Sequence, residues 1–134
     1  MAKTALANLT TEKHAQLVEL EKNFAGIKAG STMLVATPQI VDTYIRGIPR
    51  GASRSIVRMR NELARKWNAH ATCPVSSAIF LRISAQAAID EMDDGKSVTE
   101  VAPFWRVISS KDKVARKLTI DSQWIDIQRE AEGI

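Results

Sequence analysis

Four polar residues that can bind phosphate recur every three or four positions in the first half of the chain: Arg54, Arg58, Asn61 and Arg65. Residues at this spacing lie on one side of an α-helix, about one turn apart. Guanidinium groups bind phosphate oxygens in bidentate geometry. The pattern predicts a helix side that contacts a nucleic acid backbone, and the alternative is a solvated face whose arginines pair with acids elsewhere in the chain.

The charge of this segment is concentrated. Residues 44–70 hold six Arg and one Lys against a single acid, Glu62, and therefore carry a net +6, whereas the whole chain carries +4. A local positive field attracts phosphate backbones or acidic protein surfaces. We expect DNA as the partner, and a protein-interaction module that presents the basic helix to an acidic partner is the alternative.

Cys73 is the one cysteine, and it precedes Pro74 at the start of a predicted helix. Free amide groups and the helix dipole can stabilise a thiolate at such a position. A nucleophilic cysteine usually needs a base, and the two histidines are His14, on the first predicted helix, and nearby His70. We expect a buried structural thiol, and a thiol enzyme that uses Cys73 ranks last among the hypotheses.

The sequence contains no motif for binding a metal or a cofactor. One cysteine and two distant histidines give no ligand pair at zinc spacing, and Asp90, Asp93 and Asp94 do not follow a calcium-loop pattern. The sequence therefore predicts no metal site, no cofactor and no catalytic residue.

Phe104, Trp105 and Arg106 form a third candidate site. Adjacent aromatic rings can stack on an extruded base while the arginine contacts a phosphate or a neighbouring loop. The chain has only three Trp, three Phe and one Tyr, so this pair could instead anchor the core of the C-terminal half. Both interpretations stay open.

Helices must position these residues. Thr10 or Thr11 can cap a first helix that runs to about Ala25, because Leu17, Leu20, Phe24 and Ile27 recur at helical spacing. After a short apolar stretch over residues 33–36, Thr37 can cap a second helix, with Pro38 in its first turn and Gln39 to Arg46 in its body.

A turn at Ile48-Pro49-Arg50-Gly51 precedes the basic helix, which Ser53 or Ser55 can cap and which reaches Trp67. Its apolar stripe is expected to pack inward and consists of Ile56, Met59, Leu63 and Trp67.

A long helix is expected from Val75 to Met92, with a core formed by Ile79, Phe80, Ile83, Ala87 and Ile89. Residues 102–108 read as a loop or a short strand, and two final helices begin near Lys111 and Asp121. The basic helix, a short link and the long apolar helix suit a helix-turn-helix-like core.

Length and composition agree with one small soluble domain. The chain has 134 residues, of which 45% are hydrophobic and 25% charged. No apolar run approaches the roughly 20 residues that cross a bilayer. The polar N-terminus does not resemble a signal peptide and a lone cysteine cannot form an intramolecular disulfide, so we expect a cytoplasmic protein with no membrane contact.

These pieces together resemble the DNA-binding domain of the alkylguanine-DNA alkyltransferases, and especially the alkyltransferase-like proteins that lack the reactive cysteine. The resemblance covers roughly residues 38–134: a helix, Ile-Pro-Arg-Gly at 48–51, two helices, Pro-Phe-Trp-Arg-Val at 103–107, and a terminal helix that ends in Glu132-Gly133. It implies a DNA-binding surface and a pocket for an extruded or damaged base.

The family's alkyl-accepting cysteine lies in Pro-Cys-His-Arg-Val, and Phe104 stands at the cysteine position. The family mechanism of alkyl transfer is therefore excluded. Trp105 stands at the histidine that activates the cysteine, whereas Glu132 matches the glutamate that orients this histidine. The alkyltransferase-like proteins also carry an aromatic residue at the cysteine position but normally retain the histidine.

Two further family features differ in this chain. The family has a Thr-Tyr pair whose tyrosine helps to rotate a nucleotide, and Ser55-Ile56 occupies the same spacing. The family's recognition helix carries an arginine that fills the gap left by the flipped base. Arg82 is the one arginine of the corresponding predicted helix, although Ser76 or Ser77 can occupy that position instead.

The sequence thus predicts a mainly α protein, with a helical N-terminal extension over residues 1–35 and a winged helix-turn-helix-like, alkyltransferase-like domain over residues 36–134. We expect a non-enzymatic DNA-binding protein that recognises damaged or extruded bases. The predicted base pocket is Phe104, Trp105 and Arg106, and the predicted DNA-binding residues are Arg50, Arg54, Arg58, Arg65 and Arg82.

Overall fold

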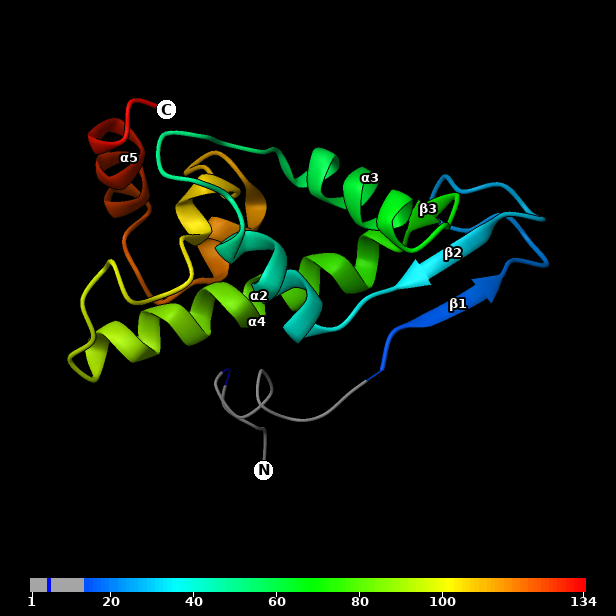
Figure 1. The fold of residues 1–134 in the computed structure, drawn as a ribbon, viewed down its shortest axis with the longest axis horizontal. Helices are drawn as coiled ribbons and strands as arrows, with labels where there is room; N and C mark the ends of the chain where they lie inside the picture. Colours follow the sequence, from blue (N-terminus) through cyan, green and yellow to red (C-terminus); the bar gives the residue numbers. More distant parts are fainter. Residues whose placement is uncertain (1–4, 6–13) are drawn as a thin grey trace.

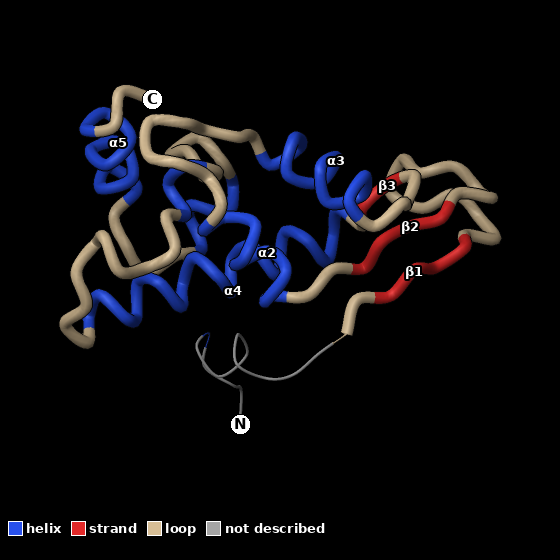
Figure 2. The backbone as a smooth tube through the Cα atoms, in the orientation of Figure 1, coloured by secondary structure: helices blue, strands red, loops and turns tan. Residues whose placement is uncertain are grey.

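The computed structural model describes residue 5 and residues 14–134. Helices dominate this part of the chain, and a small sheet joins them (Figures 1 and 2). The strands are β1 (Gln16–Glu19), β2 (Thr32–Val35) and β3 (Ala71–Thr72). The helices are α2 (Pro38–Arg46), α3 (Ile56–Lys66), α4 (Pro74–Asp93) and α5 (Ser122–Ala131), with short 3-10 helices η1 (Phe104–Arg106) and η2 (Lys113–Lys117).

The sheet lies at one end of the molecule and α5 at the other (Figure 1). The long helix α4 runs between them and packs against α2, whereas α3 packs against β3. The segment between α3 and α4 contains β3, which pairs in parallel with β2. The predicted mainly helical class is therefore confirmed, and the small sheet is an addition to it.

The first predicted helix is wrong over the described residues. Residues 16–19 form β1, which pairs antiparallel with β2 and sets Leu17 opposite Leu34. Ala25 and Gly26 adopt φ of 48° and 84° between Phe24 and Ile27, which pair with each other. Two consecutive positive φ values produce a tight hairpin turn. The apolar residues recur at helical spacing, but they do not form one buried side, and residues 16–19 pair with the strand at 32–35 instead. The predicted caps Thr10 and Thr11 lie outside the described residues.

Both central helices begin at capping residues that the sequence offers. The Thr37 hydroxyl accepts a hydrogen bond from the Ile40 amide at 3.1 Å, and Pro38 occupies the first turn of α2. The Ser55 hydroxyl accepts from the Arg58 amide at 3.0 Å, so Ser55 rather than Ser53 caps α3. These contacts satisfy amide groups that the first helical turn leaves without intrahelical partners.

The helix α4 confirms the predicted long helix, but its buried side differs in part from the expectation. Ala87 and Ile89 are buried, Phe80 and Ile83 are half-buried, and Ile79 is 45% exposed. Apolar residues occur on more than one side of α4, so spacing alone did not select the side that faces α2. The prediction that Ile79 belongs to the core is wrong.

The C-terminal part is more irregular than predicted. Residues 102–108 form a loop around η1 and no strand, and the helix expected from Lys111 is the short η2. The last helix, α5, begins where it was expected, because the Asp121 carboxylate accepts from the Gln123 amide at 2.9 Å.

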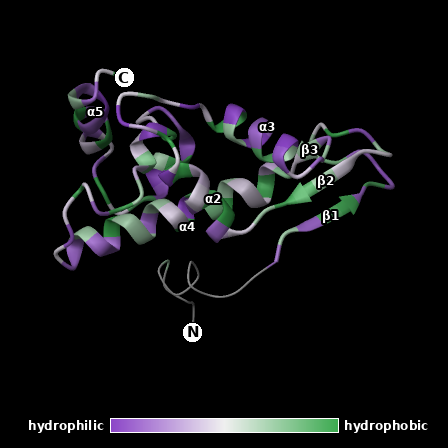
Figure 3. Cartoon of the chain, viewed as in Figure 1, coloured by the Kyte–Doolittle hydropathy of each residue, from purple (hydrophilic) through white to green (hydrophobic). Residues whose placement is uncertain are grey.

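One hydrophobic core joins the two ends of the molecule. It extends from Leu34 in β2 through Met59 and Leu63 of α3 to Ile125 of α5, each at most 2% exposed. Trp67, the last member of the predicted stripe of α3, is 37% exposed and lies outside this core. Hydrophilic and hydrophobic bands follow each other along α3, as expected for a helix with one buried side (Figure 3). Among the described residues, no helix is long and apolar enough to span a membrane.

Candidate nucleic-acid interface and adjoining cavity

Two of the predicted arginines on and beside α3 share one acid, Glu62. The Nε atom of Arg58 lies 3.3 Å from Glu62 Oε1, and that of Arg54 lies 3.9 Å from the same oxygen. The Tyr44 hydroxyl of α2 donates to this oxygen at 2.6 Å, and the Arg54 guanidinium lies 5.5 Å from the centre of the Tyr44 ring. On this flank the arginines pair with an acid of the chain, as in the alternative to nucleic-acid contact, although this acid lies on α3 itself.

The charges of this flank are fixed at neutral pH. Burial and the hydrogen bond with Glu62 raise the pKa of Tyr44 to about 12, so its hydroxyl remains a donor. The hydrogen bond from Tyr44, helped by Arg58 and Arg54, lowers the pKa of Glu62. Glu62 is therefore a permanent carboxylate that neutralises part of the arginine charge.

The outward side of α3 carries the remaining predicted residues. Asn61 and Arg65 are exposed, and the Arg58 side chain is 58% exposed despite its ion pair. Arg65 has no acidic partner within the described part of the chain. The structure thus brings Arg58, Asn61 and Arg65 to one accessible surface, as their spacing predicts.

Arg50 and Arg82 lie on other elements. Arg50 is exposed in the loop before α3, where its Nη2 atom donates to the Ala131 carbonyl at 3.4 Å. Arg82 is exposed on α4, and no interaction within the described residues connects it with the arginines of α3.

A second cluster surrounds the carboxylate of Glu132, at the end of α5. Trp105 Nε1 donates to Oε2 at 2.6 Å. Arg106 donates from Nε to Oε1 at 2.8 Å and from Nη2 to Oε2 at 3.1 Å, and the Gly51 amide donates to Oε1 at 3.0 Å. The Glu132 side chain is only 2% exposed. One buried carboxylate thus ties together the loop before α3, η1 and the end of α5.

These donors control the ionisation of Glu132. Burial alone would raise the pKa of its carboxyl group, but hydrogen bonds from Arg106, Trp105 and the Gly51 amide lower it to about 2. Arg106 also donates from Nη1 to the Ile48 carbonyl at 2.8 Å. The Arg106 guanidinium therefore donates its hydrogen bonds to Glu132 and Ile48, so its role is to position neighbouring groups.

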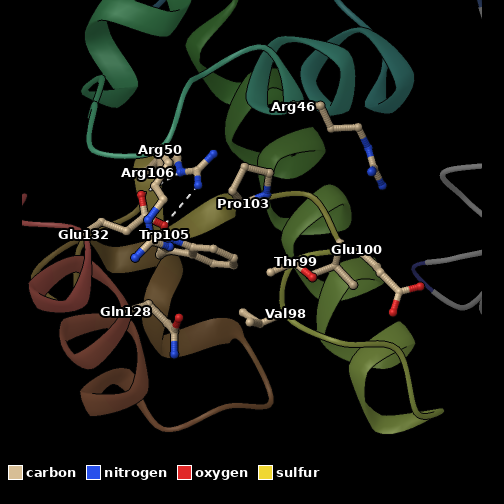
Figure 4. A pocket seen from close by; sticks show the side chains of 11 residues that line it. Arg46, Arg50, Val98, Thr99, Glu100, Pro103, Trp105, Arg106, Gln128 and Glu132 are labelled. Atoms are coloured by element: carbon tan, nitrogen blue, oxygen red, sulfur yellow. Dashed lines mark hydrogen bonds and ion pairs between the residues drawn. The ribbon is translucent and has the colours of Figure 1, made fainter.

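A cavity of about 310 Å³ adjoins this cluster. Trp105, Arg106 and Glu132 form one side of it, and Val98, Thr99 and Glu100 approach from the segment after α4 (Figure 4). Arg46 of α2, Arg50 and Gln128 of α5 complete the polar part of its lining. The cavity therefore offers an indole, an amide and arginine side chains.

Phe104 does not line this cavity. Its side chain is completely buried, with its ring centroid 5.7 Å from that of Trp124 in a stacked arrangement and 5.4 Å from that of Trp105 in an edge contact. Of the three predicted pocket residues, Trp105 and Arg106 border the cavity and Phe104 belongs to the core.

The sequence did not predict four residues of these sites: Tyr44 and Glu62 beside the arginines, and Arg46 and Gln128 in the cavity lining. Tyr44, Arg46 and Gln128 come from α2 and α5, which approach the sites only in the folded chain. Glu62 could have been found, since it follows Arg58 by four positions, a spacing at which opposite charges meet on a helix.

Cys73 caps α4 and is 5% exposed. Its Sγ atom accepts from the Ser76 amide at 3.5 Å, and Nδ1 of His70 accepts from the Thr32 amide at 2.8 Å. A buried thiol is poorly accessible to a substrate. Within the described residues, no three His, Cys, Asp or Glu side chains gather as metal ligands would.

Comparison of the chain with protein-family models, with curated proteins and with solved structures finds no match.

Proposed function

We propose that the chain is a non-enzymatic, alkyltransferase-like DNA-binding protein whose helix α3 contacts backbone phosphates. The observation that carries this proposal is the exposed basic side of α3, where Arg65 has no acidic partner among the described residues and Arg58 remains largely accessible. An accessible guanidinium group on a helix suits phosphate contacts, most of all where it has no internal acidic partner, as for Arg65. We assign α3, α4 and the β1–β2 hairpin to a winged helix-turn-helix-like arrangement as part of this proposal.

The contacts of Glu132 support the family resemblance behind the proposal. Trp105 and Glu132 occupy the positions of the family's interacting histidine and glutamate, and they are hydrogen-bonded although 27 residues apart. Gly51, from the Ile-Pro-Arg-Gly segment, donates to the same carboxylate. Three separate segments of the resemblance thus meet at one group.

The cavity beside Trp105 is the proposed site for an extruded base. Its volume of about 310 Å³ falls at the small end of the range for ligand pockets. The edge of the Trp105 indole and the Gln128 amide suit a planar heterocycle with hydrogen-bonding edges, and Arg50 lies where it can contact the attached phosphate. Phe104 at the acceptor position supplies no nucleophile, so recognition without alkyl transfer is the proposed activity.

Fluorescence polarisation with labelled duplex DNA over a salt series tests the phosphate surface. We expect binding that weakens as salt increases, and Arg65→Gln should weaken it severalfold and reduce the slope of log affinity against log salt by about one. Glu62→Gln should strengthen binding by about threefold because it frees Arg54 and Arg58 from an internal carboxylate. Arg116→Gln, an exposed charge on η2, is the matched control. Equal behaviour of all variants would contradict the assignment to α3.

A duplex with one alkylated guanine tests the cavity in the same assay. We expect tighter binding to this duplex than to the unmodified one, and Gln128→Ala should abolish the difference while leaving the affinity for unmodified DNA unchanged. Equal affinity of the wild-type protein for both duplexes would contradict the proposed base pocket and leave the proposed phosphate surface unaffected.

A protein partner is the second candidate function. Val75 and Ile79, one turn apart on α4, are 55% and 45% exposed, and exposed apolar side chains also suit a protein interface. Absence of DNA binding at low salt, together with binding of an acidic polypeptide such as polyglutamate, would favour this candidate.

A further inference from the structure

Another cavity is lined by residues of the hairpin, of α3 and of β3, and it shares no lining residue with the cavity beside Trp105. The strands lie at the end of the molecule opposite α5 (Figure 1). The volume of this cavity is about 200 Å³. The turn of the β1–β2 hairpin at residues 25–27 lines one side, Arg60 and Asn61 of α3 line another, and residues 71, 72 and 74 close it. None of these residues belongs to the predicted DNA-binding set, although Asn61 is part of the polar pattern on α3.

Arg60 differs from the paired arginines of the molecule. Its side chain has no acidic partner within residues 14–134, although the residue is half-buried. Its main chain is fixed, because the Arg60 carbonyl accepts from the Thr72 hydroxyl at 2.8 Å. Partial burial of an unpaired charge carries a desolvation cost that a bound anion offsets. The position of Arg60 therefore favours an anionic ligand.

The hairpin supplies additional donors. Phe24 and Ile27 exchange two backbone hydrogen bonds of 2.9 and 2.7 Å, which leave the amide groups of Ala25 and Gly26 without acceptors among the described residues. Exposed amides in a turn with positive φ suit contacts with an anion. Residues 16–31 carry two acids and two lysines and so have no net charge. Recognition here must therefore be local and not due to a long-range field.

The ring of Phe24 indicates what the anion is attached to. It is 41% exposed and immediately precedes the turn that lines the cavity. Aromatic and other apolar side chains beside phosphate-binding groups commonly contact the sugars and bases of nucleic acids. An inorganic anion would leave this ring without a function.

We propose that this cavity binds a backbone phosphate of duplex DNA through Arg60 and the turn amides, so that the β1–β2 hairpin acts as a wing beside α3. The inference rests on the proposed DNA binding and extends it to a second contact. The hairpin contact and the outward side of α3 then engage the same duplex at two places.

Two measurements test the wing. In fluorescence polarisation with unmodified duplex, Arg60→Gln should weaken binding about fivefold and reduce the salt slope by about one, and Phe24→Ala should weaken binding with the slope unchanged. Arg116→Gln, which removes the same charge from η2, should leave binding close to wild type. In NMR titrations with inorganic phosphate, the amide signals of Gly26 and Asn61 should shift in the wild type and not in Arg60→Gln. Thermal melts establish that each variant is folded.

The outcomes separate this inference from the proposed function. If Arg65→Gln weakens DNA binding and Arg60→Gln does not, the wing is overturned while the α3 surface stands. If phosphate shifts the turn signals but Arg60→Gln leaves DNA affinity unchanged, the cavity binds free anions only and the wing is again overturned. If the wild type binds no DNA, both proposals fail.

Discussion

At the scale of single residues, Glu132 connects three separate segments of the chain. Its buried carboxylate accepts hydrogen bonds from Trp105, Arg106 and the Gly51 amide. The Trp105 indole donates its ring N–H to this carboxylate, a contact that an imidazole N–H could also make. Under the proposed relationship to the alkyltransferase-like proteins, tryptophan at position 105 keeps this structural contact and offers no acid-base group.

The low pKa of Glu132 predicts a specific acid sensitivity. A group whose pKa falls from an ordinary 4.5 to about 2 on folding stabilises the folded state above pH 4.5 and loses this contribution as the pH falls towards 2. We expect Glu132→Gln to lower the free energy of unfolding at pH 7 by about 3 kcal/mol, because it leaves the Arg106 charge buried and unpaired.

Urea unfolding over a pH series measures both effects. Between pH 4.5 and 2 the wild type should lose stability more steeply than Glu132→Gln, and the two curves should converge at the acidic end. Parallel curves would show that Arg106, Trp105 and the Gly51 amide do not lower the pKa of Glu132 in the folded protein.

At the scale of elements, the start of α3 determines where the basic side points. Ser55 caps the helix through the Arg58 amide, while Ser53 lies two residues earlier and is exposed. Arg58 and Arg65 share a side because of their spacing, and a helix shifted by one residue relative to the rest of the fold would turn that side by about 100°.

The two serines provide a matched pair for testing this start. Ser55→Ala should lower the free energy of unfolding by about 1 kcal/mol, since it removes the capping acceptor, and Ser53→Ala should change it by less than about 0.5 kcal/mol. Thermal or chemical denaturation measures both. A similar loss in the two variants would mean that the cap is shared or lies elsewhere.

The hairpin is the element whose prediction failed. Its apolar residues recur at helical spacing, yet Leu17 and Phe24 are 53% and 41% exposed and form no buried helical side. Local patterns cannot reveal that residues 16–19 pair with residues 32–35, since strand pairing depends on a partner elsewhere in the chain.

At the scale of the whole molecule, the core crosses the boundary that the sequence analysis placed after residue 35. Leu34 of β2 is completely buried in the same cluster as Ile125 of α5, and Met33 is 6% exposed. The strand β2 also pairs with β3, which lies between α3 and α4 in the chain.

A fragment of residues 36–134 tests how far the two parts depend on each other. The fragment lacks Leu34, so we expect a loss of at least about 3 kcal/mol, comparable to deletion of a large buried side chain with its cavity. Circular dichroism and tryptophan fluorescence should follow one transition in the full chain and a broader, lower transition in the fragment. Equal stability would establish residues 36–134 as an independent domain.

By itself, the sequence determined the mainly helical class, the beginnings of α2 and α5, and the common side of Arg58, Asn61 and Arg65, and it limited the cap of α3 to Ser53 or Ser55. These features depend on short-range chemistry: a capping side chain, a proline in a first turn, and a spacing of three or four residues. Only the tertiary structure decided that residues 16–35 form a hairpin, that Phe104 lies in the core, that Tyr44 contacts Glu62, and that Glu132 binds Arg106. Those outcomes depend on which distant segments meet, and local spacing carries no information about such long-range contacts.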